Sequence, residues 1–402
     1  MESSSELISR PIYLDRVRPY MGKDLIKVLI GQRRAGKSCL MGLVAQEIAA
    51  QPVPPNLIRV DMELPEFANL RTEKDLLDFV SSRQRPGRNV LLIDEVQEIE
   101  GFERALRGLN ASGNFDIYCT GSNASLLSRD LSTLLAGRCV EIAVFPLTYP
   151  EYLVFHRVAD SDETLRAYFE FGGLPYLRHL DSAAGVRADY LRNIYQAILY
   201  RDVVARHALR NPALLERLVL FLADILGSPV SAKRISDFLK SQRIHASPRV
   251  ILDYLDHLQE ACFLERVPRY DIRGRRVFEV NDKYYFADIG LRNAVAGFRP
   301  GDIGQILENT VFHHLRSRGF RVRVGVMDGL EVDFVAEKDG GTRYYQVAYL
   351  LPDSATVERE FGNLEKIPND YPKTVISMDP MAGGERQGIR HLPLREFLME
   401  SA

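Results

Sequence analysis

The segment GQRRAGKS at residues 31–38 has the residue types and spacing that bind a nucleotide phosphate. Its glycines let backbone N–H groups close around phosphate oxygens, a lysine can neutralise the β and γ charges, and a hydroxyl can ligate magnesium. Lys37 and Ser38 would fill these last two roles. The segment therefore predicts binding of ATP with Mg²⁺. The residues expected to contact the nucleotide are Gly31, Gln32, Arg33, Arg34, Ala35, Gly36, Lys37, Ser38 and Cys39.

A second motif ends in two carboxylates. The apolar run Val90-Leu-Leu-Ile is followed by Asp94 and Glu95, and Asp94 lies 57 positions after Lys37. An acid at the end of a buried strand beside a phosphate-binding loop can hold magnesium, and the next carboxylate can polarise the attacking water. We assign the metal role to Asp94 and the catalytic role to Glu95. The alternative is that both acids only cap a core strand.

Two further polar groups are candidates for sensing the nucleotide. Thr120, Ser122 and Asn123 follow an apolar run at 115–119, where side chains can lie at the carboxyl edge of a sheet. Ser122 and Asn123 are therefore expected to contact the γ-phosphate. Arg138 precedes another strand, and its guanidinium is a candidate catalytic group acting in its own or a neighbouring subunit, with a surface arginine as the alternative.

Apolar runs alternate with helical patterns through the first part of the chain. The run at 26–30 ends at Gly31 and helical spacing begins at Ser38, which is the strand-loop-helix context that the glycine loop requires. Further buried strands are expected at 57–62, 90–94, 115–119 and 140–144. The fold class is therefore α/β, with the parallel sheet of a P-loop NTPase.

Downstream, the pattern divides into three further modules. Helical spacing dominates 165–230, interrupted by Gly172–Pro175 and by Asn211-Pro212, a helix start. We expect a helical lid on the ATPase core. The predicted domains are an ATPase core at 1–160, a lid at 161–211, a winged helix at 212–284 and a second α/β module at 285–402.

The winged helix is predicted from three helical segments followed by a hairpin. Runs at 263–267 and 276–280 are joined by the turn at 271–274. The second helix of such a module would be 247–261, whose solvent face carries three acids, and residues 212–285 hold 12 Lys or Arg against 10 Asp or Glu. Strong DNA affinity does not follow. The better basic candidate is the wing, which carries Arg269, Arg273, Arg275 and Arg276, although a solvated hairpin or a protein interface is equally consistent.

The last module combines a helix near 306–318 with strands around 321–324, 331–336, 344–348 and 374–377.

The overall composition limits the class of protein and its partners. In 402 residues, hydrophobic types make up 46% and charged types 26%, and the net charge of −2 gives no chain-wide attraction to nucleic acid. Four scattered cysteines suggest neither zinc nor disulfides. No signal or membrane-spanning pattern is evident, so a cytoplasmic protein is expected.

Together the motifs are similar to a known family. The strings GQRRAGKS, VLLIDEVQE, TGSNASLLS, LAGR followed by FPLTYPEY, GGLP, and EVDFVAEKDG with YYQVAY occur in order between Ile12 and Pro393. This set resembles the prokaryotic AAA-type ATPases, akin to the AAA+ and STAND groups, that carry a C-terminal DUF4143 domain.

The resemblance implies two further sites. A GxP element such as Gly173-Leu-Pro175 can touch the nucleotide from the lid, so Pro175 is an expected contact; a helix-terminating turn is the alternative. The last module would resemble a restriction endonuclease, whose site combines acids with an E/Q-x-K triplet. The matching residues are Glu308, Asp333 and Gln346, but Ala348 replaces the lysine, so Lys338 or Arg343 would have to substitute. We therefore expect this module to be catalytically inactive.

Three functions remain open on the sequence. The first is an ATP-dependent molecular switch, in which nucleotide state changes the arrangement of core, lid and winged helix. The second is a DNA-associated ATPase that uses the wing and the last module. The third is a scaffold that uses nucleotide only for folding, against which Glu95 argues. A protein partner or a homo-oligomer is compatible with all three.

Overall fold

The computed structural model describes residues 7–123, 135, 137–181, 183–278, 281–380 and 383–400. The chain forms two compact units, the first made of Met1–Phe145 with Glu260–Cys262 and the second of Pro146–Gln259 with Phe263–Ala402. The predicted lid, winged helix and last module fall almost entirely in the second unit, so their division stays a prediction. Among the described residues, no helix has both the length and the apolar character needed to span a membrane.

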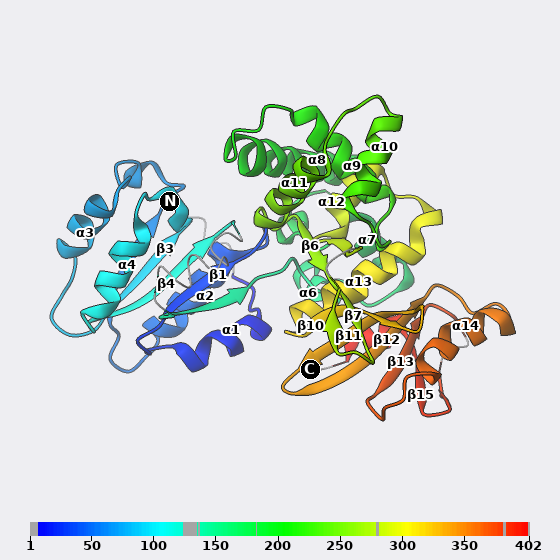
Figure 1. The fold of residues 1–402 in the computed structure, drawn as a ribbon. Helices are drawn as coiled ribbons and strands as arrows, with labels where there is room; N and C mark the ends of the chain where they lie inside the picture. Colours follow the sequence, from blue (N-terminus) through cyan, green and yellow to red (C-terminus); the bar gives the residue numbers. More distant parts are fainter. Residues whose placement is uncertain are drawn as a thin grey trace. The chain divides into compact units, whose positions relative to one another are not determined.

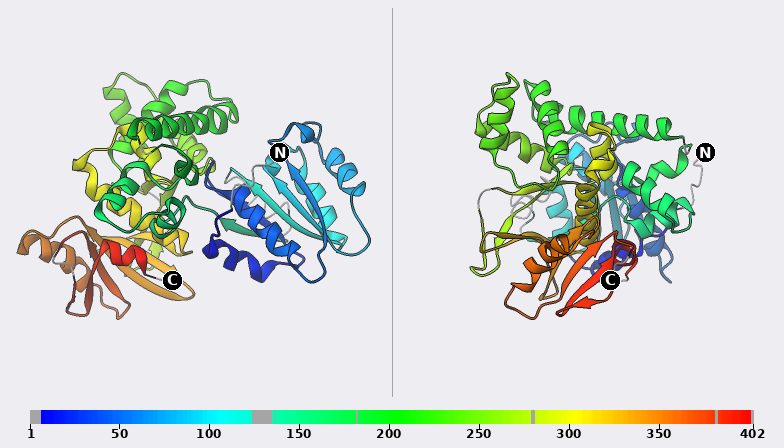
Figure 2. Two further views of the ribbon diagram at one scale, coloured as in Figure 1. Left: turned by 180° about the vertical axis from the view of Figure 1, so that it is seen from behind. Right: turned by 90° about the vertical axis from the view of Figure 1, so that its right-hand side faces the viewer.

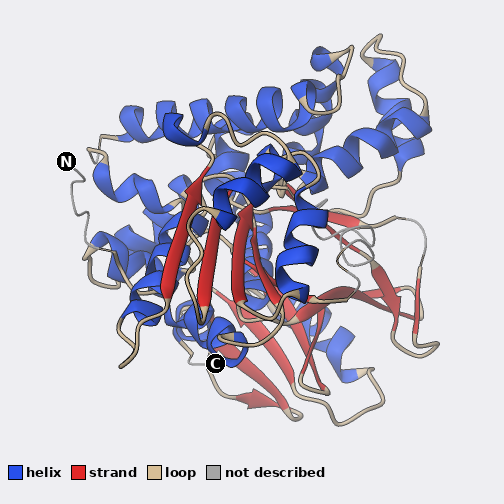
Figure 3. Cartoon of the chain, turned by 90° about the vertical axis from the view of Figure 1, so that its left-hand side faces the viewer, coloured by secondary structure: helices blue, strands red, loops and turns tan. Residues whose placement is uncertain are grey.

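The first unit is built on a five-stranded sheet in the order β2-β3-β4-β1-β5, with every pairing parallel (Figures 1 and 3). This confirms the predicted parallel α/β core. Each expected strand is present, with bounds shifted by a residue or two. The strands are β1 (Ile26–Ile30), β2 (Asn56–Asp61), β3 (Asn89–Asp94), β4 (Phe115–Gly121) and β5 (Cys139–Ala143).

Helices cover both faces of this sheet because successive strand residues point to opposite sides. Val28 and Ile30 pack in one core with α3 (Glu73–Ser81) and α4 (Phe102–Ala111). Leu29 packs on the other face with α1 (Pro11–Val17) and α2 (Lys37–Ala49). The strands are buried on both faces, which is why they read as continuous apolar runs in the sequence.

The second unit begins with helices. Asn211 caps one of them, since its Oδ1 accepts a hydrogen bond from the Leu214 N–H at 3.1 Å and Pro212 occupies the first turn, as the sequence predicts. The helices are α6 (Tyr149–His156), α7 (Asp162–Phe171), α8 (Ala184–Ala197), which continues as a π-helical segment (Ile198–Ala205), α9 (Pro212–Asp224), α10 (Ala232–Ser241), α11 (Pro248–Glu260), α12 (Ile289–Ala296), α13 (Ile303–Ser317), α14 (Ser354–Glu365) and α15 (Leu394–Met399).

An eight-stranded mixed sheet dominates the C-terminal half of this unit (Figure 2). Helix α13 packs on the face that carries Phe334, and α14 packs on the face that carries Val335 and Tyr344. The strand order is β14 (Glu385–Arg386), β15 (Ile389–Pro393), β13 (Lys373–Ser377), β12 (Gly341–Ala348), β11 (Leu330–Lys338), β10 (Arg321–Met327), β7 (Arg269–Asp271) and β8 (Arg276–Val277).

The predicted hairpin between 263–267 and 276–280 is wrong in its pairing. Strand β6 (Leu264–Val267) instead pairs with β9 (Lys283–Phe286), and β7 pairs with β8. Pro268 separates β6 from β7, and β7 then runs parallel to β10 as part of the large sheet. Two of the four wing arginines form ion pairs, Arg273 with Asp328 at 2.9 Å and Arg276 with Asp271 at 3.4 Å, and both side chains remain exposed.

A buried ion pair lies at the amino edge of the first sheet. Lys27 on β1 is fully buried, and its ammonium contacts Asp116 on β4 as well as the carbonyls of Lys23 and Leu25. Asp116 also accepts hydrogen bonds from the Gly22 N–H at 2.9 Å and the Tyr118 hydroxyl at 3.1 Å. Burial lowers the pKa of Lys27, and the contact with Asp116 opposes that shift.

Removing the carboxylate should therefore be costly. Asp116→Ala leaves a buried ammonium without its counter-ion, and we expect it to lower the free energy of unfolding by about 3 kcal/mol. Urea denaturation measures the change. Asp78→Ala, at an exposed position of α3, is the matched control and should have little effect. Equal losses in the two variants would contradict a stabilising role for the pair.

Candidate nucleotide-binding site

The glycine loop joins β1 to α2 and needs glycine at both of its ends. Gly36 has φ of 95°, in the left-handed region that side chains disfavour. At Gly31 the reason is proximity, since a β-carbon there would lie 2.0 Å from the carbonyl oxygen of Val144. The loop is thereby held against the end of β5, where the Val144 N–H donates to the Ile30 carbonyl at 2.6 Å.

Lys37 begins α2 and is almost completely buried. Its ammonium donates to the loop carbonyls of Gly31 at 3.0 Å and Gln32 at 3.1 Å, and its Nζ lies 3.8 Å from Glu95 Oε1. The cation therefore lies against the inner side of the loop, between the peptide groups that would surround a phosphate and the acid at the end of β3. This geometry suits a group that exchanges carbonyl ligands for phosphate oxygens.

Gln32 gives an independent indication that the loop accommodates a polar ligand. Its side chain is only 2% exposed, yet neither Nε2 nor Oε1 has a hydrogen-bond partner among the described residues. A buried amide without partners costs free energy, and such a group calls for an explanation such as a ligand or an ordered water. Lys37 contacts the carbonyl of Gln32, so the unpaired side-chain amide belongs to a residue next to this ammonium.

The two acids at the end of β3 lie beside the loop. Asp94 is buried and is hydrogen-bonded to Ser38, so the two predicted magnesium ligands are in contact. The hydroxyl of Thr120 on β4 donates to Asp94 Oδ1 and accepts a hydrogen bond from the Glu95 N–H at 2.9 Å. Hydroxyl and carboxylate oxygens are the ligands that Mg²⁺ prefers, so this donor set fits the ion.

The environments of the two acids shift their pKa values in opposite directions. Burial raises the pKa of Asp94, although hydrogen bonds from Ser38 and Thr120 oppose the shift. Burial also disfavours the ionised form of Glu95, but the Lys37 charge and a hydrogen bond from Gln97 outweigh it and lower the pKa of Glu95. Glu95 also has φ of 53°, a strained conformation for a residue other than glycine.

The other predicted contacts are distributed unevenly around the loop. Ser122 and Asn123 are buried at the end of β4, which lies between β3 and β1, so they share the sheet edge with the loop. Arg33 lies 3.7 Å from Glu63, whereas Arg34 and Cys39 are exposed. The rest of the TGSNASLLS string, residues 124–128, lies outside the residues that the structure describes.

Arg138 is in the wrong place for a catalytic group of its own subunit. It immediately precedes β5, where Cys139 pairs with Ile26 at the start of β1, and its side chain is exposed. The phosphate loop follows the other end of β1, five residues and about 16 Å away along the strand. The sequence showed only that Arg138 precedes a strand; the parallel register then puts it at the opposite edge. A role in a neighbouring subunit stays a prediction.

Comparisons with known proteins place this site in a family. A family described as an AAA domain matches residues 23–153, and a domain of unknown function (DUF8612) matches residues 162–302. An uncharacterized protein of Haemophilus influenzae is 33% identical over 404 residues, covering 99% of this chain and 100% of that protein. The chain belongs to the same family. The sequence motifs led us to expect DUF4143, whereas the domain matched after the AAA domain is DUF8612.

More distant relatives agree with the fold. An uncharacterized protein of Methanocaldococcus jannaschii is 28% identical over 362 residues, covering 86% of this chain and 79% of its own length. Among solved structures, a Walker-type ATPase of Pyrococcus abyssi superposes with a TM-score of 0.50 at 17% identity, covering 70% of this chain and 93% of that one. With the AAA match, these findings show an AAA-type P-loop ATPase fold.

Sequence reasoning missed the role of Arg10 at the site of this AAA domain. Arg10 is 3% exposed, and its guanidinium donates to the carbonyls of Ala35 at 2.9 Å and Phe145 at 3.0 Å. It thus connects the phosphate loop to the end of the first unit. No local sequence signal announces this contact, because Arg10 lies 25 positions before Ala35 and 135 before Phe145. Thr120, in contrast, was recognisable as a polar residue at the end of a strand.

Pro175 and its glycines lie in the second unit, where close packing accounts for the glycines. A β-carbon at Gly173 would lie 2.2 Å from the Leu147 carbonyl oxygen, and one at Gly172 would lie 2.3 Å from Asp288. The Gly173 N–H donates to Asp288 Oδ2 at 2.7 Å, and burial raises the pKa of Asp288 to about 6. A contact between Pro175 and nucleotide stays a prediction.

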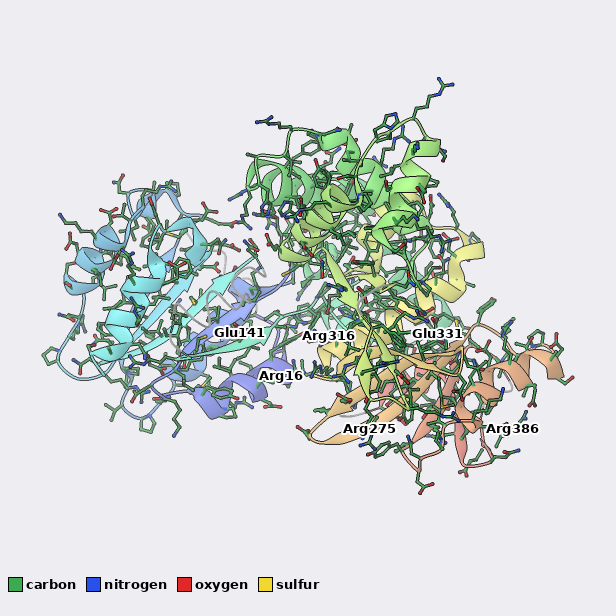
Figure 4. The ribbon with its side chains drawn as sticks, viewed as in Figure 1. Arg16, Glu141, Arg275, Arg316, Glu331 and Arg386 are labelled. Atoms are coloured by element: carbon green, nitrogen blue, oxygen red, sulfur yellow. The ribbon has the colours of Figure 1, made fainter. Side chains whose placement is uncertain are left out.

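The three residues expected from the endonuclease-like pattern come together with a lysine that the sequence did not single out. Lys283 on β9 is 3% exposed, and its Nζ lies 2.8 Å from both Glu308 and Glu331 and 3.8 Å from Asp333. Gln346 donates to Glu360 at 3.0 Å and faces the Asp333 N–H at 3.4 Å. Figure 4 labels Glu331 of this acidic cluster. Neither Lys338 nor Arg343, the suggested substitutes, is hydrogen-bonded or ion-paired to these acids among the described residues.

Proposed function

We propose that this protein binds ATP with Mg²⁺ through residues 31–39 and hydrolyses it slowly to drive a conformational switch. The observation that supports this most directly is the convergence of Lys37, Asp94 and Glu95 at one edge of a parallel sheet, together with the buried, unsatisfied amide of Gln32. Ligands of open α/β sheets bind at the carboxyl ends of the strands, which is where these groups lie.

Each residue has a distinct part in the proposed reaction. The N–H groups of the loop and the Lys37 ammonium would bind the phosphates, and Ser38 and Asp94 would hold Mg²⁺. The ion would supply positive charge that offsets the charge of the phosphates. Glu95 orients the attacking water and accepts its proton. Ser122 and Asn123, at the end of the neighbouring strand, are positioned to detect the γ-phosphate.

The pairing of Lys37 with Glu95 suggests how the base is activated. In the structure, the Lys37 charge lowers the pKa of Glu95 and makes it a weak proton acceptor. A phosphate that draws the ammonium away from Glu95 removes this stabilisation and makes the carboxylate more basic. Glu95 would therefore become a stronger base when the substrate is bound, at the stage when the attacking water must lose its proton.

The switch is supported by the contacts of Arg10. Its guanidinium joins the Ala35 carbonyl, in the loop that would surround the phosphates, to the Phe145 carbonyl. Phe145 is the last residue of the first unit before the chain continues into the second. A change of the loop on nucleotide binding would act directly on this exit point, which is the route by which we propose that the nucleotide state reaches the second unit.

A second function, metal-dependent cleavage of a phosphodiester, is favoured by the position of Lys283. The endonuclease-like pattern lacks its lysine because residue 348 is alanine, but Lys283 brings a buried ammonium to the same acids. Burial and the Glu308 charge raise the pKa of Asp333, while Lys283 opposes the shift. Three carboxylates against one ammonium leave this cluster with net negative charge, and the DUF4143-like, nuclease-like identity of this module is part of this proposal.

The catalytic role of Glu95 is tested by Glu95→Gln in the full-length protein. ATP turnover should fall by about 100-fold or more, because the amide cannot accept a proton, while ATP binding is retained. Chelation of Mg²⁺ should abolish turnover in the wild type. Exposed Glu100→Gln is the matched control and should keep the wild-type rate.

The same assay separates the ATP-dependent switch, the DNA-associated ATPase and the scaffold. It is run with and without single- and double-stranded DNA, at low and physiological salt. Slow, DNA-indifferent turnover supports the switch, and DNA-dependent turnover that is lost in Glu95→Gln supports a DNA-associated ATPase. Nucleotide binding with no turnover under any condition would leave only the scaffold.

The coupling through Arg10 is tested by hydrogen exchange. ATP should slow amide exchange at residues 144–145 in the wild type, and Arg10→Gln should lose most of this response while still binding ATP. Arg18→Gln removes an exposed arginine that pairs with Glu47 and Asp15, and serves as the control. An unchanged response in Arg10→Gln would show that Arg10 does not transmit the nucleotide state.

The proposed phosphodiester cleavage is tested by Mg²⁺ and Mn²⁺ titrations and by cleavage of linear DNA. Asp333→Asn should abolish metal binding and any cleavage. Lys283→Met should abolish cleavage and still bind the metal, since it removes only the ammonium. Glu396→Gln, exposed on α15, is the control. A wild-type protein that neither binds metal here nor cuts DNA would refute this function.

A further inference from the structure

A cavity of about 330 Å³ lies at one end of the β11–β12 hairpin, beside the carboxyl end of α13. It is lined by Arg318, Phe320, Lys338, Asp339, Gly341, Arg343 and Glu400, all in the second unit. It shares no residue with the phosphate loop or with the acidic cluster around Lys283. Its volume is at the lower end of the range of small-molecule sites.

Strand register explains why two of its cations meet. Lys338 is the last residue of β11 and pairs with Gly341, and Arg343 of β12 pairs with Ala336. Residues 336 and 338 share a face of the sheet, so Lys338 and Arg343 are diagonal neighbours on that face. The third cation, Arg318, comes from the residue that follows α13, the helix packed on the same face.

Phe320 holds two of these cations in place. The ring is 6% exposed, with the Lys338 Nζ 5.6 Å and the Arg343 Cζ 5.5 Å from its centroid. Cations at this distance from an aromatic face are attracted to it without being neutralised. The ring therefore orders the two side chains and leaves their charges available to a ligand.

The cavity lining holds three cations and two carboxylates, Asp339 and Glu400, so its net charge is weakly positive. Among the described residues, neither Lys338, Arg343 nor Arg318 has a carboxylate oxygen within 4.0 Å, whereas Glu400, which also lines the cavity, pairs with Arg390 at 2.7 Å.

The Arg318 guanidinium is in an unfavourable place for a cation. It contacts His314 Nε2 at 3.2 Å, and burial and the nearby arginine lower the pKa of His314 to about 3, so this histidine is neutral. Burial lowers the pKa of Arg318 itself, the nearby Tyr345 and Glu400 oppose the shift, and Arg343 adds to it. An anion in the cavity would offset the cost of burying this cation.

We propose that this cavity binds the phosphate group of a phosphomonoester. Two guanidinium groups and one ammonium suit a phosphate dianion, since guanidinium groups can donate two parallel hydrogen bonds to its oxygens. The cavity is larger than a phosphate ion alone requires, so an organic group can enter with it. A free nucleoside monophosphate and the 5′-phosphorylated end of a nucleic acid offer the same chemistry.

The test is calorimetric titration of the full-length protein carrying Lys37→Ala, which removes the main cation of the phosphate loop. The probes are inorganic phosphate, AMP and a short oligonucleotide with or without a 5′-phosphate. Lys338→Gln with Arg343→Gln should weaken binding of phosphate and AMP at least tenfold. Arg321→Gln with Lys366→Gln removes the same charge from exposed positions of the same module and should leave the affinity unchanged.

The outcomes are distinct. Tighter binding of AMP than of the phosphorylated oligonucleotide identifies a free nucleotide as the ligand, and the reverse order identifies a nucleic-acid end. Absence of saturable phosphate and AMP binding, or equal affinity in the two double variants, would each overturn the proposal. Because the P-loop is disabled in every arm, failure here is independent of the proposed ATPase activity.

Discussion

The close approach of β1 and the end of β5 is the constraint on which the nucleotide site depends. The carbonyl oxygen of Val144 occupies the space where residue 31 would carry a β-carbon. Only glycine therefore allows the loop to leave the sheet in this direction, with its carbonyls turned toward Lys37 and its far side held by Arg10. Any side chain at residue 31 would have to separate β1 from the edge strand β5, which close-packed interiors tolerate poorly.

The two edges of the same sheet use buried lysines in opposite ways. At the amino edge, Lys27 is matched by Asp116 at contact distance, and the pair is surrounded by further hydrogen bonds. At the carboxyl edge, Lys37 is satisfied mainly by loop carbonyls and lies 3.8 Å from Glu95. A saturated ion pair fixes structure, whereas a cation held by exchangeable carbonyls can transfer to a ligand. The chemistry is therefore concentrated at one edge and the stability at the other.

The second unit shows a similar separation along a single strand. Asp333 lies in the first half of β11, close to Lys283 and Glu308, while Lys338 ends the strand about 16 Å away, beside the cavity that Arg318 and Arg343 also line. The large sheet also incorporates β7 and β8, so the segment expected to form a free basic wing is instead paired to β10. Arg273 and Arg276 pair with aspartates, and DNA binding by this segment stays a prediction.

The sequence by itself determined the features that arise from local pattern. Apolar runs and helical periodicity predicted the parallel sheet, the phosphate loop and the acids at the end of β3, because strand burial and phosphate binding each require particular residue types at short spacing. The tertiary structure decided what depends on register and on distant contacts. It placed Arg138 at the opposite edge of the sheet from the loop, paired β6 with β9, and brought Arg10 to Ala35 and Lys283 to Glu308. Arginine and lysine are common on protein surfaces, and the partners of these residues lie far away in the sequence. Only the folded structure therefore shows that Arg10 and Lys283 are buried and paired.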